Sequence, residues 1–132
     1  GFTLIELLVV IAILAVLAAG VFVAIDPIDK INAANDAKVQ NYIGQIRQGM
    51  EAYAVSNLGV YPANPSPTLV NSGDIKVVPS APTGYTYSYG AGGPSQYACG
   101  TLQSKKYTAT PFWVWCSTSG KAGPTTACTT CP

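Results

Sequence analysis

A long uncharged run near the start of the chain constrains the fold more than any other feature. Residues 7–25 read LLVVIAILAVLAAGVFVAI, nineteen residues without a charge. A helix needs about 20 apolar residues to cross a bilayer, so this run is long enough to span a membrane. A secretory signal peptide would have basic residues before the run and a small-residue cleavage site after it. No basic residue precedes Phe2, and Asp26-Pro27 follows the run, so the pattern favours a retained membrane helix.

The composition weighs against catalysis. With 132 residues there is room for one domain with a modest core. The chain has no histidine, which removes the commonest general base and the commonest metal ligand. Seven basic and six acidic residues give a net charge of +1, which indicates neither nucleic acid nor an acidic membrane surface as a partner. We therefore expect a protein that is not an enzyme and that holds no cofactor.

Glu6 is the charged residue that interrupts the apolar N-terminus. A carboxylate inside a membrane helix costs about 3 kcal/mol on insertion scales, and such residues usually serve a function with a specific partner. The first basic residue is Lys30, which lies about 36 Å further along a helix and cannot reach Glu6 in the same chain. A nearby positive group is an α-amino terminus, on this chain or on a neighbouring copy. The position of Glu6 therefore predicts self-assembly, which a plain membrane anchor does not explain.

The first seven residues, GFTLIEL, followed by the apolar run, resemble the N-terminal signature of type IV pilins and pseudopilins. The resemblance implies that a prepilin peptidase cuts after Gly1 and methylates Phe2. Gly1, which is present in this chain, would then be the last residue of the leader. The resemblance also implies that Glu6 pairs with the N-terminal amine of an adjacent subunit during assembly. It extends over residues 1–62, and beyond them only the layout is similar.

A second helical pattern follows the apolar run. We assign residues 1–26 to an apolar half and residues 27–58 to an amphipathic half of one long helix. Asn57–Gly59, followed by Pro62, are suited to end it. The apolar positions recur at spacings of three, four and seven. They are Ile28, Ile31, Val39, Tyr42, Ile43, Ile46, Met50, Tyr53 and Ala54.

Gly20 and Pro27 are the two residues expected to disturb this helix. Proline removes one backbone hydrogen bond and clashes with the preceding turn, and glycine weakens a helix. We therefore expect a bend or a locally melted segment near residues 20–27. In filaments of the family that the chain resembles, unwinding in this region accompanies assembly.

The remainder of the chain predicts a small β head. Residues 59–83 are rich in proline and predict a connecting loop with one short strand at residues 75–78. Residues 84–132 predict an antiparallel sheet and a Ser/Thr-rich, disulfide-bonded tail, with strands at residues 85–89, 96–103 and 109–117. The whole pattern predicts an α+β pilin fold, in which a three-stranded meander lies on the helix.

Alternation along the last of these strands divides its aromatic residues between two faces. Trp113 and Trp115 point to one side, and Phe112, Val114 and Cys116 point to the other. One of these sets must be exposed, or be covered by the tail or by a neighbouring subunit. The tail itself, residues 117–132, is dense enough in Ser and Thr to make O-glycosylation an open alternative to a bare flexible tail.

Four cysteines in the C-terminal third predict two disulfides formed in an oxidising compartment. Three pairings are possible. Cys99 and Cys116 lie on adjacent predicted strands, so we expect a Cys99–Cys116 bridge and a Cys128–Cys131 bridge. The Cys-x-x-Cys spacing of the second pair also matches redox and zinc sites. A redox pair would normally sit at a helix N-terminus and a zinc ribbon would need a second such pair, so disulfides are favoured.

We predict a structural subunit, a major pilin, that polymerises into an extracellular type IV pilus. Its partners would be copies of itself, the prepilin peptidase, the assembly machinery and, before assembly, the inner (cytoplasmic) membrane. A pseudopilin of a type II secretion or DNA-uptake system is one alternative, and a membrane-anchored extracellular binding module with an aromatic head surface is another. Lys105, Lys106 and Lys121 are more typical of a solvated surface than of a DNA site. Asp74 is the one carboxylate of the head, which disfavours calcium.

Overall fold

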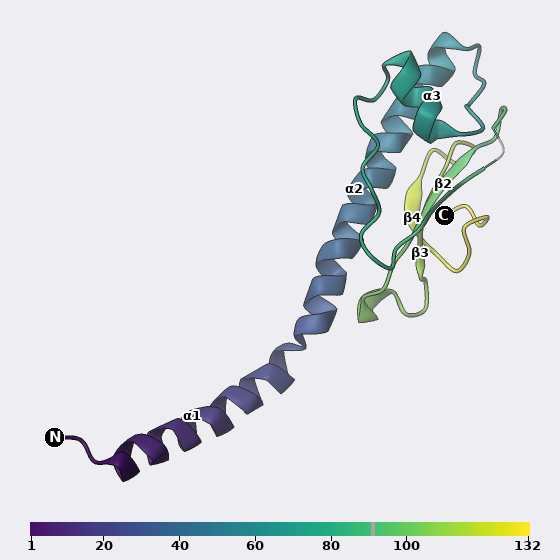
Figure 1. Cartoon of the computed structure of the whole chain (residues 1–132). Helices are drawn as coiled ribbons and strands as arrows, with labels where there is room; N and C mark the ends of the chain where they lie inside the picture. Colours follow the sequence, from purple (N-terminus) through teal and green to yellow (C-terminus); the bar gives the residue numbers. More distant parts are fainter. Residues whose placement is uncertain (91) are drawn as a thin grey trace.

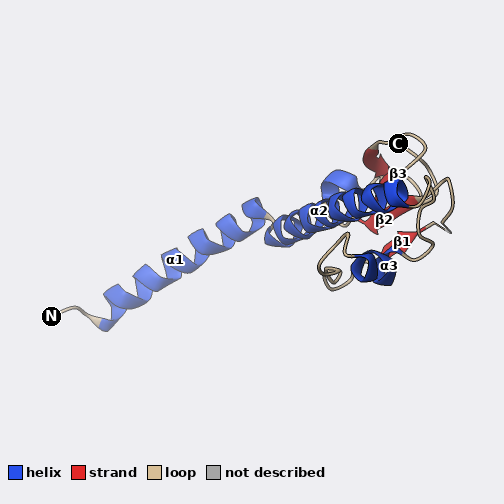
Figure 2. Cartoon of the chain, turned by 90° about the horizontal axis from the view of Figure 1, so that it is seen from above, coloured by secondary structure: helices blue, strands red, loops and turns tan. Residues whose placement is uncertain are grey.

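A computed structural model describes residues 1–90 and 92–132 of the chain. Two consecutive helices, α1 (Leu4–Ile25) and α2 (Pro27–Ser56), form a long stem, and a small head lies beside the C-terminal part of α2 (Figure 1). Seen from above, α1 and α2 differ in direction, and the strands lie along one side of α2 (Figure 2). The predicted α+β pilin-like architecture, a long N-terminal helix followed by a small antiparallel sheet, is confirmed.

One residue separates the two helices. Asp26 adopts φ 47° and ψ 71°, a left-handed conformation that ends α1, and its carboxylate accepts a hydrogen bond from the Asp29 N–H at 3.4 Å. Pro27 is the first residue of α2, where its missing N–H removes no helical hydrogen bond. The bend therefore lies at Asp26. Gly20 lies inside α1 and does not interrupt it, so unwinding over residues 20–27 remains a prediction for the assembled state.

The sheet has four antiparallel strands in the order β1-β2-β3-β4, one more than predicted. The strands are β1 (Tyr87–Tyr89), β2 (Tyr97–Thr101), β3 (Phe112–Cys116) and β4 (Ala122–Thr125). The first three are shorter than the predicted segments. The fourth lies in the tail and has the sequence AGPT, which has low β propensity. Its Pro124 is tolerated because β4 is an edge strand that pairs with β3 on one side.

The connection between α2 and the sheet contains a helix that the sequence pattern did not predict. Helix α3 spans Pro65–Ser72, with proline at its first position and Gly73 at its C-terminal cap with φ 83°. The short strand predicted at residues 75–78 is wrong, because this described segment pairs with no strand. Between the second and third predicted strands the chain forms a short 3-10 helix, η1 (Lys105–Tyr107).

The main core lies between α2 and the sheet. Val39, Ile43 and Ile46 of α2 are fully buried against Trp115 of β3 and Ala98 of β2. The amphipathic pattern is therefore right from Val39 onward. It is wrong for Ile28 and Ile31, which are 70% and 62% exposed because the head does not cover them.

The second face of the sheet is covered by the tail. Val114, Cys99 and Cys116 form a small buried cluster on this face, with Cys128 of the tail packed against it. Trp115 faces α2 and the tail covers the opposite face.

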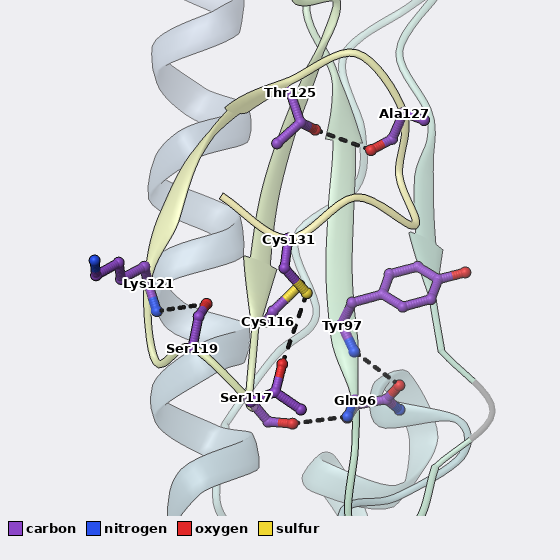
Figure 3. Close-up of a disulfide and its surroundings, with 10 residues drawn as sticks. Gln96, Tyr97, Cys116, Ser117, Ser119, Lys121, Thr125, Ala127 and Cys131 are labelled. Atoms are coloured by element: carbon purple, nitrogen blue, oxygen red, sulfur yellow. Dashed lines mark hydrogen bonds between the residues drawn. A yellow bond between two sulfur atoms is a disulfide. The ribbon is translucent and has the colours of Figure 1, made fainter.

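The predicted disulfide pairing is wrong. The bridges are Cys99–Cys128 and Cys116–Cys131, with Cα–Cα distances of 5.4 and 5.6 Å. Cys99 pairs in register with Val114 and Cys116 pairs with Tyr97, so the two cysteines are diagonal neighbours. Diagonal side chains on adjacent strands lie about 7–8 Å apart, whereas bonded cysteines need Cβ atoms at about 4 Å. The tail folds back over the sheet, where Cys128 bonds to Cys99 of β2 and Cys131 bonds to Cys116 of β3. Figure 3 shows the Cys116–Cys131 bridge.

Gly100→Ala is expected to lower the free energy of unfolding by about 1–3 kcal/mol, because a methyl group there would collide with Val39 Cγ1 and lie 3.2 Å from the Tyr87 ring. Gly44→Ala is the matched control. Its new methyl group would meet nothing within 4 Å, and alanine in place of a helical glycine stabilises by up to about 1 kcal/mol. Thermal unfolding of the full chain in detergent micelles, followed by near-UV circular dichroism, measures both. Equal effects of the two changes would contradict this packing.

Candidate assembly surface

Helix α1 presents an apolar surface on every side. Across the described residues 4–25 none is buried, and large side chains such as Leu4 (82%) and Val23 (86%) are almost fully exposed. The helix is long and apolar enough to cross a membrane. An apolar surface of this extent on a folded chain marks an interaction with lipid or with another protein.

Glu6 forms a capping box with Thr3 at the start of α1. The Glu6 carboxylate accepts hydrogen bonds from the Thr3 N–H at 2.9 Å and from the Thr3 hydroxyl at 2.8 Å, while the Glu6 N–H donates to Thr3 Oγ1 at 3.3 Å. Glu6 therefore has a hydrogen-bonding partner in its own chain, which the sequence reasoning missed. The signal was present as Thr-x-x-Glu directly before an apolar run.

No positively charged group pairs with Glu6 among the described residues. The ion pairs in the described part of the chain join Arg47 to Glu51 and Lys105 to Asp26. Neither reaches the capping box. Both bonds from Thr3 go to Glu6 Oε2, so Oε1 has no hydrogen-bond partner among the described residues. Beside it, Phe2, Ile5, Val9 and Val10 line a shallow apolar hollow of about 410 Å³.

Gly1 and Phe2, the predicted processing residues, precede the capping box. Helix α1 begins at Leu4 with Thr3 as its N-cap, so both residues lie outside the helix. The Phe2 side chain is 97% exposed. The peptide bond between them is therefore accessible in the isolated chain.

The three lysines considered for DNA binding do not form one patch. Lys105 and Lys106 precede β3, and Lys121 follows it, so they lie at opposite ends of that strand. The Lys105 ammonium pairs with the Asp26 carboxylate, which raises the pKa of Lys105. Lys106 lies over the Tyr107 ring, 5.1 Å from its centre.

The four cysteines and Asp74 also make contacts within the chain. All four cysteines are in disulfides, so the Cys-x-x-Cys segment has no thiol for zinc or for redox exchange. Asp74 accepts a hydrogen bond from the Ser72 hydroxyl at 2.5 Å. In the described residues no group of three or more metal-ligating side chains lies together.

The match to known proteins lies at the N-terminus. Residues 1–22 match the family model described as the prokaryotic N-terminal methylation motif. A search of curated proteins and a search of solved structures each found no match. The matched segment contains Gly1, Phe2 and the Thr3–Glu6 capping box, and it continues along most of α1. The chain therefore carries the signature of the type IV pilins and pseudopilins, which are structural proteins, on a pilin-like fold.

Proposed function

We propose that the chain is the major subunit of an extracellular type IV pilus, held together by packing of α1 against α1 of its copies. The exposed apolar surface of α1 is the observation that supports this most directly. In Figure 1 the helix extends away from the head, which leaves its surface free for contact with copies. Before assembly the same surface would lie in the lipid of the cytoplasmic membrane.

Glu6 would neutralise the N-terminal amine of an adjacent subunit. Oε2 keeps its two bonds to Thr3, and Oε1 can accept a hydrogen bond from the incoming ammonium group. A charge-assisted bond in an apolar environment is stronger than the same bond in water, since the alternative is an unpaired charge in lipid. The capping box therefore orients the carboxylate for a partner that lies outside the chain.

Membrane insertion would give all copies the same orientation, with their heads on the outer side. Two disulfides are suited to that oxidising environment. A head of this size has a small core, and cross-links compensate for that. The alternative of a binding module is disfavoured because some of the aromatic residues that it would use are packed inside the chain. Trp115 is fully buried against α2, and Tyr42 stacks on Tyr87 with the ring centres 4.0 Å apart.

Filaments sheared from cells that make the chain test the proposal. We expect electron microscopy to show long fibres, and mass spectrometry of the fibre protein to show a chain that begins at methylated Phe2. Cells without prepilin peptidase are the control, and they should show no fibres. Absence of the chain from surface fibres, with short periplasmic assemblies in their place, would identify a pseudopilin instead. A chain that stays in the membrane as a monomer would contradict both.

A further inference from the structure

We propose that residues 103–105, in the connection between β2 and β3, form a clamp that sets the direction of α1 relative to the head. The clamp contacts the helical stem at its break, through Asp26, and beyond the break at two carboxylates of α2, Asp29 and Asp36. The head would thereby control the angle at which the membrane helix leaves it.

One end of the clamp is fixed by Asp36. The carboxylate of Asp36 is 1% exposed and accepts hydrogen bonds from the N–H groups of Gln103 at 2.8 Å and Ser104 at 3.0 Å, and from the Ser104 hydroxyl. A buried carboxylate that loses its hydrogen bonds carries a large free-energy penalty, so this contact is hard to open. Burial and the Asp36 carboxylate raise the pKa of the neighbouring Tyr85 to about 12. The Tyr85 hydroxyl donates a hydrogen bond to the Asn32 carbonyl at 3.2 Å.

The other end of the clamp holds the break itself. The Lys105 N–H donates to Asp29 Oδ1 at 2.7 Å, and the Lys105 ammonium pairs with the Asp26 carboxylate. Asp26 is the residue at which the helical path is interrupted, so a change in direction of α1 requires a change in its backbone angles. Its positive φ is rare for a residue with a side chain, and its carboxylate also caps α2. Lys105 thus contacts the point where the stem can turn.

The two ends differ in strength. The Lys105 and Asp26 side chains are 77% and 40% exposed, and exposed ion pairs are weak and are screened by salt. The Asp36 end is buried and uncharged groups donate to it. The clamp can therefore release Asp26 while it remains attached to α2. Helix α1 has 22 residues and is about 33 Å long, so a small rotation at Asp26 moves Glu6 a long way.

One consequence rests on the proposed function. Copies can pack both their α1 helices and their heads only at a compatible angle between stem and head. A chain already held near that angle loses less conformational freedom on assembly. This consequence is separable from the clamp, which exists in the single chain.

Residual dipolar couplings of the full chain in detergent micelles test the clamp. At low salt we expect one alignment tensor to fit α1 and α2 of the wild type. In Lys105→Gln the couplings of α1 should fall by about half or more relative to those of α2, because the helix samples several directions. Lys106→Gln is the matched control: it loses the same charge from the next residue, which contacts the Tyr107 ring and not the break.

Two further arms make the outcome decisive. Asp26→Asn removes the charge but keeps an oxygen that can cap α2, and it should reproduce the effect of Lys105→Gln. In the wild type, 0.5 M salt should do the same. Unchanged α1 couplings in Lys105→Gln, or an equal fall in Lys106→Gln, would overturn the proposal. The measurement uses the monomer, so the clamp can fail while the pilus proposal stands, and the reverse.

Discussion

Glu6→Gln is expected to lower the amount of assembled filament by roughly 10- to 150-fold, because charge-assisted hydrogen bonds contribute about 1.5–3 kcal/mol. Glutamine has the same shape and can still accept both hydrogen bonds from Thr3. It cannot neutralise the amine of a neighbouring subunit. Membrane insertion should be unchanged or improved, since a charge has left the apolar segment. Sheared surface protein, quantified against the membrane fraction, measures the ratio.

Thr3→Ala is the control that separates assembly from capping. It removes the hydroxyl that accepts from the Glu6 N–H and leaves the carboxylate charged. Loss of an N-cap costs about 1 kcal/mol, so assembly should fall less than tenfold. If Thr3→Ala abolished filaments and Glu6→Gln did not, Glu6 would be a helix cap and not an assembly residue. A simple membrane anchor would tolerate both changes.

Removal of the Cys99–Cys128 disulfide, as Cys99→Ala/Cys128→Ala, is expected to lower the free energy of unfolding by about 3–4 kcal/mol. The bridge closes a loop with a sequence separation of 29, against 15 for Cys116–Cys131. Chain entropy alone makes the longer loop worth about 0.6 kcal/mol more. Cys99 is also fully buried, so its replacement leaves a space between the sheet and the tail.

The matched control is Cys116→Ala/Cys131→Ala, which should cost about 3 kcal/mol. Unfolding of the full chain in micelles, followed by tryptophan fluorescence, compares the two because Trp115 is buried between the sheet and α2. Peptide mapping of the oxidised wild type checks the pairing itself. A peptide that contains Cys99 linked to Cys116 would contradict the structure.

The features that were predictable from the sequence depend on residues that are close together in the chain. An uncharged run long enough for a bilayer, with Glu6 near its start, determined α1 and the candidate assembly residue. The periodicity from Val39 onward determined the face of α2 that packs on the sheet. The capping box was equally local, since Thr3 and Glu6 are three residues apart, and it was missed only because Glu6 was considered as a charge and not as a cap.

The tertiary structure decided what depends on distant partners. Ile28 and Val39 fit the same helical pattern, but only the placement of the head leaves the first exposed and buries the second. Strand β4 has weak β propensity and forms because β3 offers it an edge and two disulfides hold the tail there. The disulfide pairing follows from a register offset of two residues, which shifts cysteines out of bonding range without any trace in their spacing. Local propensity thus determined the stem, and long-range packing determined how the head closes and where it holds the stem.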